Sequence, residues 1–248
     1  MSESMPVVNP ENWESFNYRS EDALVVASFD VTADELDRDE FPYCARVIIP
    51  IAAPNEFGAP DSAEAEVLWR LEDELTDALD LAGVRCRLVA RLTHNGEREL
   101  VFQLADWEEF RGPVDDWMDT VDDYDFEVSE HEGWNFFEDF CWPTDEDWCL
   151  IQDRNVITGL LEAGSNPDKE HTLDFSFQGN PEQLSVLREQ LLERGYQLSD
   201  EETDDDILVM IRRLPLSMDL IGPESLENRR LCDEIGVEFT GWGAAVEA

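Results

Sequence analysis

Lysine is almost absent from this sequence, and positive charge is scarce in general. Lys169 is the single lysine of 248 residues, and Lys plus Arg total 17 against 60 for Asp plus Glu, a formal net charge of -43. A surface this negative repels nucleic-acid phosphates and anionic membranes, so we expect neither as a direct partner. Three explanations of the acidity stay open: a salt-adapted surface, attraction to a basic partner, and mimicry of a nucleic acid.

Cysteine and histidine are also few. The five cysteines are scattered without a Cys-x-x-Cys spacing, and the three histidines lie far apart in the sequence. These patterns predict reduced thiols in a cytoplasmic protein, no metal site and no cofactor. The N-terminus has no basic segment followed by an apolar one, and no run of about 18 apolar residues occurs. We therefore expect neither a secretory signal nor a transmembrane span.

The second half of the chain is rich in boundary signals. The alternation in "HTLDFSF", residues 171–177, predicts a half-buried strand with its phenylalanines on the covered side. Asn180 and Pro181 then suit the start of a helix, and Gly195 suits its end. Further strands are expected at 196–199, 207–213 and 237–248, with a helix at 222–236 between the last two.

The first half repeats this order without repeating the sequence. Hydrophobic periodicity and turn signals predict strands at 22–30, 45–53, 84–93, 97–105 and 124–130 and helices at 62–83 and 109–121. The expected fold class is therefore α+β: two tandem ferredoxin-like (βαββαβ) sandwiches, each an antiparallel sheet with helices on one face. The expected domains are 1–132 and 150–248, joined by an aromatic and acidic connector at 133–149, and a helix is expected at 146–162.

The densest acidic run is "SDEETDDD", residues 199–206, in the predicted hairpin of the second half. A functional interpretation makes it a partner-binding site, formed by Asp200, Glu201, Glu202, Asp204, Asp205 and Asp206. The alternative is a solvated turn whose acids keep a sheet edge soluble. No calcium-binding loop spacing occurs here.

No residue pattern indicates catalysis. The histidines His94, His131 and His171 are expected at the surface, without a Ser or Cys partner in a motif. Aromatic residues of the connector, together with Trp117 and Trp242, are expected to pack inside rather than to form contact sites. The covered position of Phe175 and Phe177 argues against base stacking on the sheet.

The second half resembles the RraB family, regulators of ribonuclease E activity. The residues that carry the resemblance are "LDFSFQGNPEQLSVLREQLLERGYQL" and the closing "LCDEIGVEFTGWGAAV", over roughly residues 150–248. The family closes with an aromatic-Asp-Gly-Trp turn, and here Thr240 stands in place of the Asp. The first half resembles the uncharacterised domain often fused upstream of RraB-like domains, through "NWESFNY" and "REL…DWEEF".

The resemblance implies a non-catalytic, acidic protein that binds and inhibits a ribonuclease through protein–protein contacts. It implies that the partner surface is a basic, arginine-rich segment of that ribonuclease. Two other classes stay open: an enzyme with an unrecognised site between the domains, and a salt-adapted protein of other function.

Overall fold

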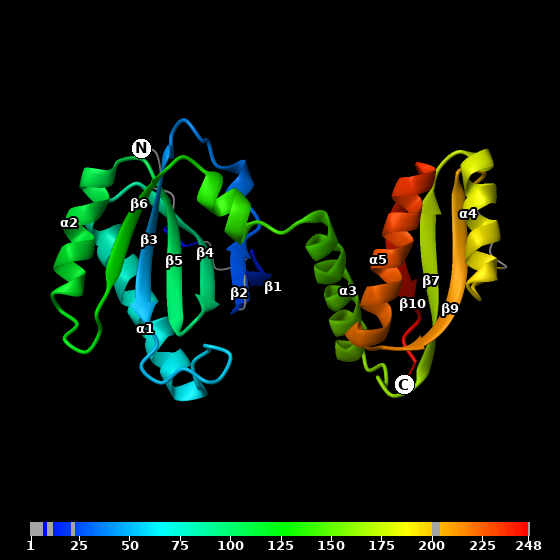
Figure 1. Cartoon of the computed structure of the whole chain (residues 1–248), viewed down its shortest axis with the longest axis horizontal. Coiled ribbons are helices and arrows are strands. Elements are labelled where there is room, and N and C mark those ends of the chain that lie inside the picture. Colours follow the sequence, from blue (N-terminus) through cyan, green and yellow to red (C-terminus); the bar gives the residue numbers. More distant parts are fainter. Residues whose placement is uncertain (1–6, 9–11, 21–22, 200–203, 248) are drawn as a thin grey trace. The chain divides into compact units, whose positions relative to one another are not determined.

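The structure is a computed structural model that describes residues 7–8, 12–20, 23–199 and 204–247. The chain divides into two compact units, Met1–Trp142 and Pro143–Ala248 (Figure 1). This division lies inside the segment 133–149 that we expect to connect the domains.

The first unit is built on a six-stranded antiparallel sheet with the strand order β1-β2-β4-β5-β3-β6. Its elements are β1 (Trp13–Ser20), β2 (Ala23–Asp30), the 3-10 turn η1 (Ala33–Glu35), β3 (Tyr43–Pro50), α1 (Ser62–Ala82), β4 (Cys86–His94), β5 (Glu97–Leu104), α2 (Trp107–Met118), β6 (Glu127–Glu132) and the π-helical turn η2 (Phe137–Cys141). The run β3-α1-β4-β5-α2-β6 has ferredoxin-like order, and the β1-β2 hairpin extends the sheet beyond β4. The predicted fold class is confirmed for this unit.

Local signals explain why these elements begin and end where they do. The Asp61 side chain accepts a hydrogen bond from the Glu64 N–H and caps α1, while Gly83, with a φ of 70°, ends it. Asn95 and Gly96 both have positive φ, 49° and 83°, so the β4-β5 hairpin closes through the tight turn that an Asn-Gly pair favours.

The two faces of this sheet are covered differently. Helices α1 and α2 lie on one face (Figure 1), where their apolar side chains form a continuous core with those of β3 and β5. On the other face, η2 contacts β2 and β4. Trp134 and Phe137 of the segment around η2 are buried, as the sequence predicts, and Trp134 Nε1 donates to the Phe41 carbonyl at 3.0 Å. Phe140 of the same segment is exposed, so its expected buried position is wrong.

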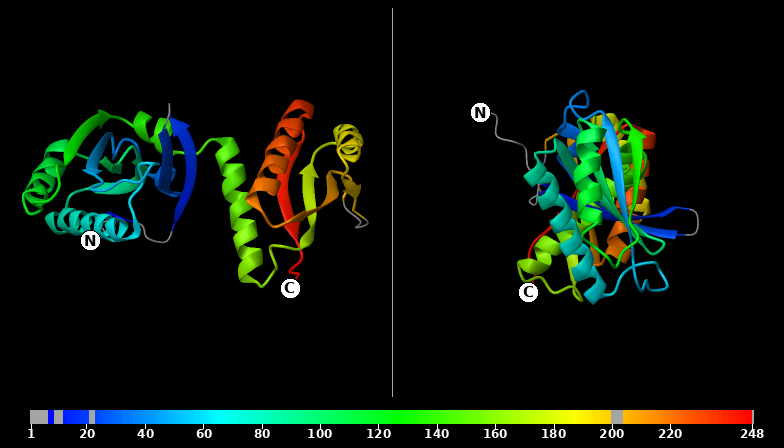
Figure 2. Two further views of the ribbon diagram at one scale, coloured as in Figure 1. Left: turned by 60° about the horizontal axis from the view of Figure 1, so that its bottom comes forward. Right: turned by 90° about the vertical axis from the view of Figure 1, so that its left-hand side faces the viewer.

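The second unit has a four-stranded antiparallel sheet with the order β10-β7-β9-β8. Its elements are α3 (Asp145–Glu162), β7 (Glu170–Gln178), α4 (Pro181–Glu193), β8 (Gln197–Leu198), β9 (Ile207–Pro215), α5 (Met218–Ile235) and β10 (Glu238–Ala244). The run from β7 to β10 is again ferredoxin-like, as predicted. Helix α3 packs beside α5, as the left view of Figure 2 shows.

The core of the second unit follows the alternation seen in the sequence. Leu173, Phe175 and Phe177 are completely buried and pack with the leucines of α4. These phenylalanines therefore face the helices, as predicted. His171 has the same phase and is also completely buried, so its expected surface position is wrong. Side chains alternate between the two faces of a strand, so His171, two residues before Leu173, lies on the same buried face.

Helix α5 begins earlier than expected. The sequence places its start near Pro223, but the helix begins at Met218, and the Ser217 carbonyl accepts hydrogen bonds from the N–H groups of Leu220 and Ile221. Pro223 thus lies inside the helix, where it has no N–H to donate to the Asp219 carbonyl. No helix in the described ranges is both long and apolar enough to span a membrane.

Candidate functional site

The described end of the acidic run, residues 204–206, directly precedes β9. Of the predicted contact residues, Asp204, Asp205 and Asp206 are exposed. Asp200, Glu201 and Glu202 lie outside the described residues.

The backbone of this turn is held where β9 begins. The Ile207 N–H donates to the Asp204 carbonyl at 3.0 Å, and the Gly179 N–H donates to the Asp206 carbonyl at 3.0 Å. Gly179 stands between β7 and α4, so the turn is tied to the start of the neighbouring helix. Exposed carboxylates on an anchored backbone reach a partner at low entropic cost.

A buried carboxyl group joins α3 to the rest of the second unit. Asp153 Oδ1 accepts hydrogen bonds from Ser225 Oγ of α5 at 2.9 Å and from Trp242 Nε1 of β10 at 2.6 Å. Burial raises the pKa of Asp153 from 3.8 to about 6, and the two hydrogen bonds oppose that shift. Trp242 therefore packs inside, as expected, and its indole serves to dock α3.

A cavity of about 250 Å³ lies beside this carboxyl group and is also lined by Cys149, Arg229 and Trp242. Arg229 Nη2 lies 3.2 Å from Asp145 Oδ2. Burial raises the pKa of the Cys149 thiol to about 11, so this sulfur stays protonated at neutral pH and is a poor nucleophile. Cys149 is therefore not an activated nucleophile. The hydrogen bonds of Asp153 beside this cavity hold α3 against α5 and β10.

A second polar cluster lies between β9, α5 and the end of α4. Tyr196 Oη donates to Glu224 Oε2 at 2.9 Å and accepts from Asn228 Nδ2 at 2.9 Å, while Arg212 Nη1 lies 2.6 Å from the same Glu224 oxygen. Tyr196 and Asn228 are buried. The Gly-Tyr pair after α4 therefore fixes packing, because the tyrosine hydroxyl is bonded to both Glu224 and Asn228.

The cysteines show no disulfide or metal chemistry within the described part of the chain. All five are buried and free. In the same ranges, no group of three or more His, Cys, Asp or Glu side chains is placed to hold a metal ion.

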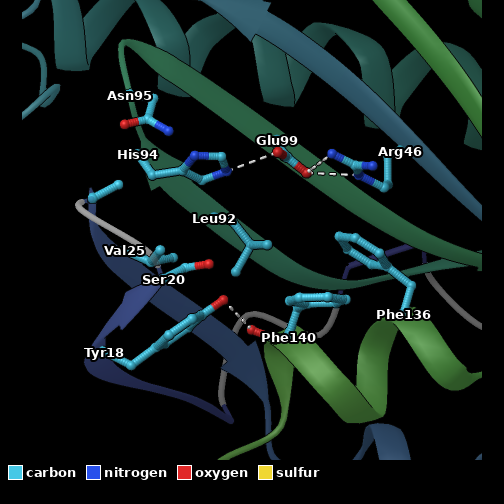
Figure 3. A pocket seen from close by; sticks show the side chains of 11 residues that line it. Tyr18, Ser20, Val25, Arg46, Leu92, His94, Asn95, Glu99, Phe136 and Phe140 are labelled. Carbon is cyan, nitrogen blue, oxygen red and sulfur yellow. Dashed lines mark hydrogen bonds and ion pairs between the residues drawn. The ribbon is translucent and has the colours of Figure 1, made fainter.

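A third cluster, which no sequence pattern indicates, lies in the first unit (Figure 3). Glu99 of β5 is almost completely buried. Its Oε1 lies 2.8 Å from His94 Nε2, and its Oε2 lies 2.6 Å from Arg46 Nη2. The Arg46 guanidinium also lies over the Phe136 ring, 4.4 Å from its centre, and that ring stacks on His131. His94 and His131 are therefore only partly exposed and have partners, which their sequence neighbours do not reveal.

The pKa values in this cluster respond to the shared carboxylate. The hydrogen bond to Glu99 raises the pKa of His94 against the opposing effect of burial. His94 and Arg46 in turn lower the pKa of Glu99, although burial acts in the opposite direction. Burial and the nearby Arg46 lower the pKa of His131. At neutral pH, Glu99 is therefore ionised between two basic side chains.

Comparison with known proteins identifies the second unit. A family model described as "Regulator of ribonuclease activity B" (RraB) matches residues 150–244. A protein named "Regulator of ribonuclease activity B" from Xenorhabdus nematophila is 30% identical over 102 residues, which cover 38% of this chain and 72% of that protein. The chain belongs to the RraB family.

Other relatives support the same RraB assignment. The Escherichia coli protein of that name is 29% identical over 102 residues, covering 38% of this chain and 74% of its own length. The Pseudoalteromonas atlantica protein is 26% identical over 99 residues, covering 36% of this chain and 84% of its own. Residues 11–142 match a "Family of unknown function (DUF695)", so this RraB chain carries a DUF695 domain in front.

Proposed function

We propose that this chain is a non-catalytic regulator that binds a ribonuclease through its RraB unit and lowers the rate of RNA cleavage. The observation that carries the proposal is the extent of the RraB match. It runs from residue 150 to 244 and so takes in the ferredoxin-like core and most of α3. The match to relatives named regulators of ribonuclease activity covers 72%, 74% and 84% of their own lengths.

The charge of the chain suggests the chemistry of the partner surface. A protein of formal net charge -43 attracts basic segments, and exposed Asp204, Asp205 and Asp206 offer carboxylates to arginine side chains. Such charges increase the association rate over about a Debye length, ~8 Å at physiological salt. We therefore propose an arginine-rich segment of a ribonuclease E-type enzyme as the partner and the acidic turn as its contact. The interaction belongs in the cytoplasm, which suits five free thiols.

A protein partner fits this unit better than RNA. RNA-binding sheets of this topology stack bases on aromatic rings of the open face. Here Phe175 and Phe177 are completely buried under the helices. The acidic surface would also repel the RNA backbone.

The experiment uses the full-length chain and a triple variant, Asp204→Asn, Asp205→Asn and Asp206→Asn. Binding to the ribonuclease of the same cell is measured by calorimetry at about 50 mM and 300 mM salt, and cleavage of a labelled RNA is measured in parallel. The matched control is Asp119→Asn, Asp122→Asn and Asp123→Asn in the first unit, which removes the same charge from exposed positions.

The parent should bind, bind more weakly at higher salt, and slow cleavage. The turn variant should bind at least about tenfold more weakly, which corresponds to ~1.4 kcal/mol, while the control stays close to the parent. Equal weakening by both variants would assign the effect to net charge and reject the turn as the contact. A parent that binds no ribonuclease at low salt would reject the regulator itself.

A further inference from the structure

The cluster around Glu99 borders a cavity on the face of the first unit's sheet opposite α1 and α2. The cavity has a volume of about 190 Å³ and is lined from β1, β2, β3, β4, β5 and the segment around η2. Its lining includes Tyr18, Arg46, His94, Glu99, Phe136 and Phe140. It lies entirely within one unit.

The charges of this lining are the reverse of those of the protein as a whole. Among the described residues that line the cavity, Glu99 is the single carboxylate, although Asp plus Glu number 60 in the chain. Two basic side chains share it: Arg46 Nε donates to Oε2 at 2.7 Å, and His94 Nε2 lies 2.8 Å from Oε1. A guanidinium carries five N–H donors, so Arg46 retains donors for a further acceptor.

The basic groups are held in place before any ligand arrives. Arg46 is fixed by Glu99 on its edge and by Phe136 on its face, and its side chain is 19% exposed. A buried ion pair of this kind is costly to the fold, and titratable groups with shifted pKa values, here His94 and Glu99, cluster at functional sites. The cluster is therefore organised to meet a negative charge.

Apart from Ser20 and Asn95, the rest of the wall is apolar and aromatic. Figure 3 shows the rings of Tyr18, Phe136 and Phe140 around the opening, with Val25 and Leu92 beside them. The Tyr18 hydroxyl donates to the Phe140 carbonyl at 2.9 Å and so ties β1 to the π-helical turn η2. Single π-helical turns are frequent at functional sites.

We propose that this cavity binds a small organic carboxylate with a planar apolar body. The carboxylate would accept hydrogen bonds from Arg46 and gain from the positive charge of His94, and the planar body would lie against the rings. The limited volume excludes drug-sized ligands, which need about 300 Å³ or more. The proposal concerns the DUF695 domain and does not depend on ribonuclease regulation by the second unit.

The test uses benzoate as the probe and the full chain at pH 6 in about 0.15 M salt, where surface charges are screened beyond ~8 Å. The three histidines allow NMR titration of their imidazole signals, assigned with single His→Gln variants. We expect saturable shifts of His94 and no shift of His171, which is buried in the other unit. The expected Kd is on the order of 1 mM. Benzyl alcohol and benzylamine, with the same ring but no negative charge, should bind at least about fivefold more weakly.

Two variants test the charged part and the aromatic part of the lining separately. His94→Gln keeps a hydrogen-bond donor toward Glu99 but removes the charge, and Phe140→Ala removes a ring that is 43% exposed. Each should weaken benzoate binding at least about fivefold, measured from the benzoate NMR signals because His94→Gln has no His94 imidazole. The control Phe57→Ala, an exposed ring outside the cavity, should leave binding unchanged. Circular dichroism and thermal unfolding establish that each variant folds.

Three results would overturn the proposal. The first is the absence of saturable His94 shifts in the folded parent at a benzoate concentration about tenfold above the expected Kd. The second is equal binding of benzoate, benzyl alcohol and benzylamine, and the third is unchanged binding in folded His94→Gln and Phe140→Ala. None of these results bears on whether the RraB unit binds a ribonuclease.

Discussion

Trp242 and Asp153, 89 positions apart in the sequence, meet inside the second unit, where the indole Nε1 donates to the carboxylate Oδ1 at 2.6 Å. The other oxygen, Oδ2, is buried and has no partner among the described side chains. The bond joins β10 to α3, the helix that precedes the ferredoxin-like core. It also places a carboxyl group where its charged form is disfavoured.

This burial makes the stability of the unit depend on pH. Below pH 3.8, Asp153 is protonated in both the folded and the unfolded chain and does not lower the free energy of unfolding. As pH rises from 3.8 to about 6, the unfolded chain loses the proton first, so the free energy of unfolding falls by up to about 3 kcal/mol. Asp153→Asn, neutral throughout, should remove this decrease. Urea titrations at pH 4 and pH 7.5 measure it.

The matched control for that measurement is Asp168→Asn. Asp168 is exposed in the loop before β7, so the substitution changes the net charge equally without touching a buried group. It should keep the pH dependence of the parent. If Asp153→Asn and Asp168→Asn give the same pH dependence, the Asp153 carboxyl does not carry the effect.

Much of this fold could be predicted because its signals are local. Caps, periods of 2 and 3.6, and the Asn95-Gly96 turn each act within a few residues, and together they gave both βαββαβ runs. Strand β1 was not predicted, because "WESFNYRS" alternates weakly. Its strand state depends on pairing with β2, as in the pair Phe16 and Ala27. His171 was misplaced although the period of its own strand marks it as buried.

The cavity cluster could not be predicted from local signals. Arg46, Glu99, His94 and His131 come from four different strands, and the register of β3 against β5 and β6 brings them together. A sequence with 60 acidic residues offers many such combinations, and none stands out before the pairing is known. The acidic turn was visible because it is contiguous, and its role in binding stays a prediction.

Two glycines of the first unit allow a test of backbone crowding. Gly58 and Gly83 have similar positive φ, 77° and 70°. A Cβ on Gly58 would lie 2.6 Å from the Asn95 backbone nitrogen, whereas one on Gly83 would meet nothing within 4 Å. Gly83→Ala should therefore cost about 1 kcal/mol for the left-handed conformation alone. Gly58→Ala should cost ~1–3 kcal/mol more, because the Asn95-Gly96 turn that faces it must move.

Chemical denaturation of the two variants measures this difference. Since the turn also carries His94 and Asn95, Gly58→Ala should shift the imidazole signal of His94, and Gly83→Ala should leave it unchanged. Equal losses of stability in the two variants would show that the loop around Gly58 yields without strain.

The acidity predicts that salt stabilises the chain. A formal net charge of -43 makes the folded state repel itself, and the Debye length falls to ~3 Å at 1 M salt. Calorimetry in KCl should show Tm rising by several degrees between about 10 mM and 1 M. Near the sequence pI of about 4.1, where the net charge vanishes, the same salt series should change Tm far less. Equal slopes at both pH values would exclude self-repulsion as the cause.

The separate cores of the two units predict that each folds alone. One core cluster draws its residues from positions 7–128 and the other from positions 156–244. The first turn of α3 belongs to the second unit, because Thr144 and Asp147 form a reciprocal capping box at its start. This turn precedes residue 150, where the RraB match and the domain expected from the sequence both begin.

Two fragments, 143–248 and 150–248, test where the second unit begins. The longer should unfold cooperatively with the Tm of one of the two transitions of the full chain. The shorter loses the capping box, buried Cys149 and the ion pair between Arg230 and Glu146, at 3.0 Å. It should be less stable by about 2 kcal/mol, mostly through the cap and the lost burial. Urea titration of both fragments measures the difference. Equal stability would move the boundary to residue 150, and a longer fragment that fails to fold would show that the units depend on each other.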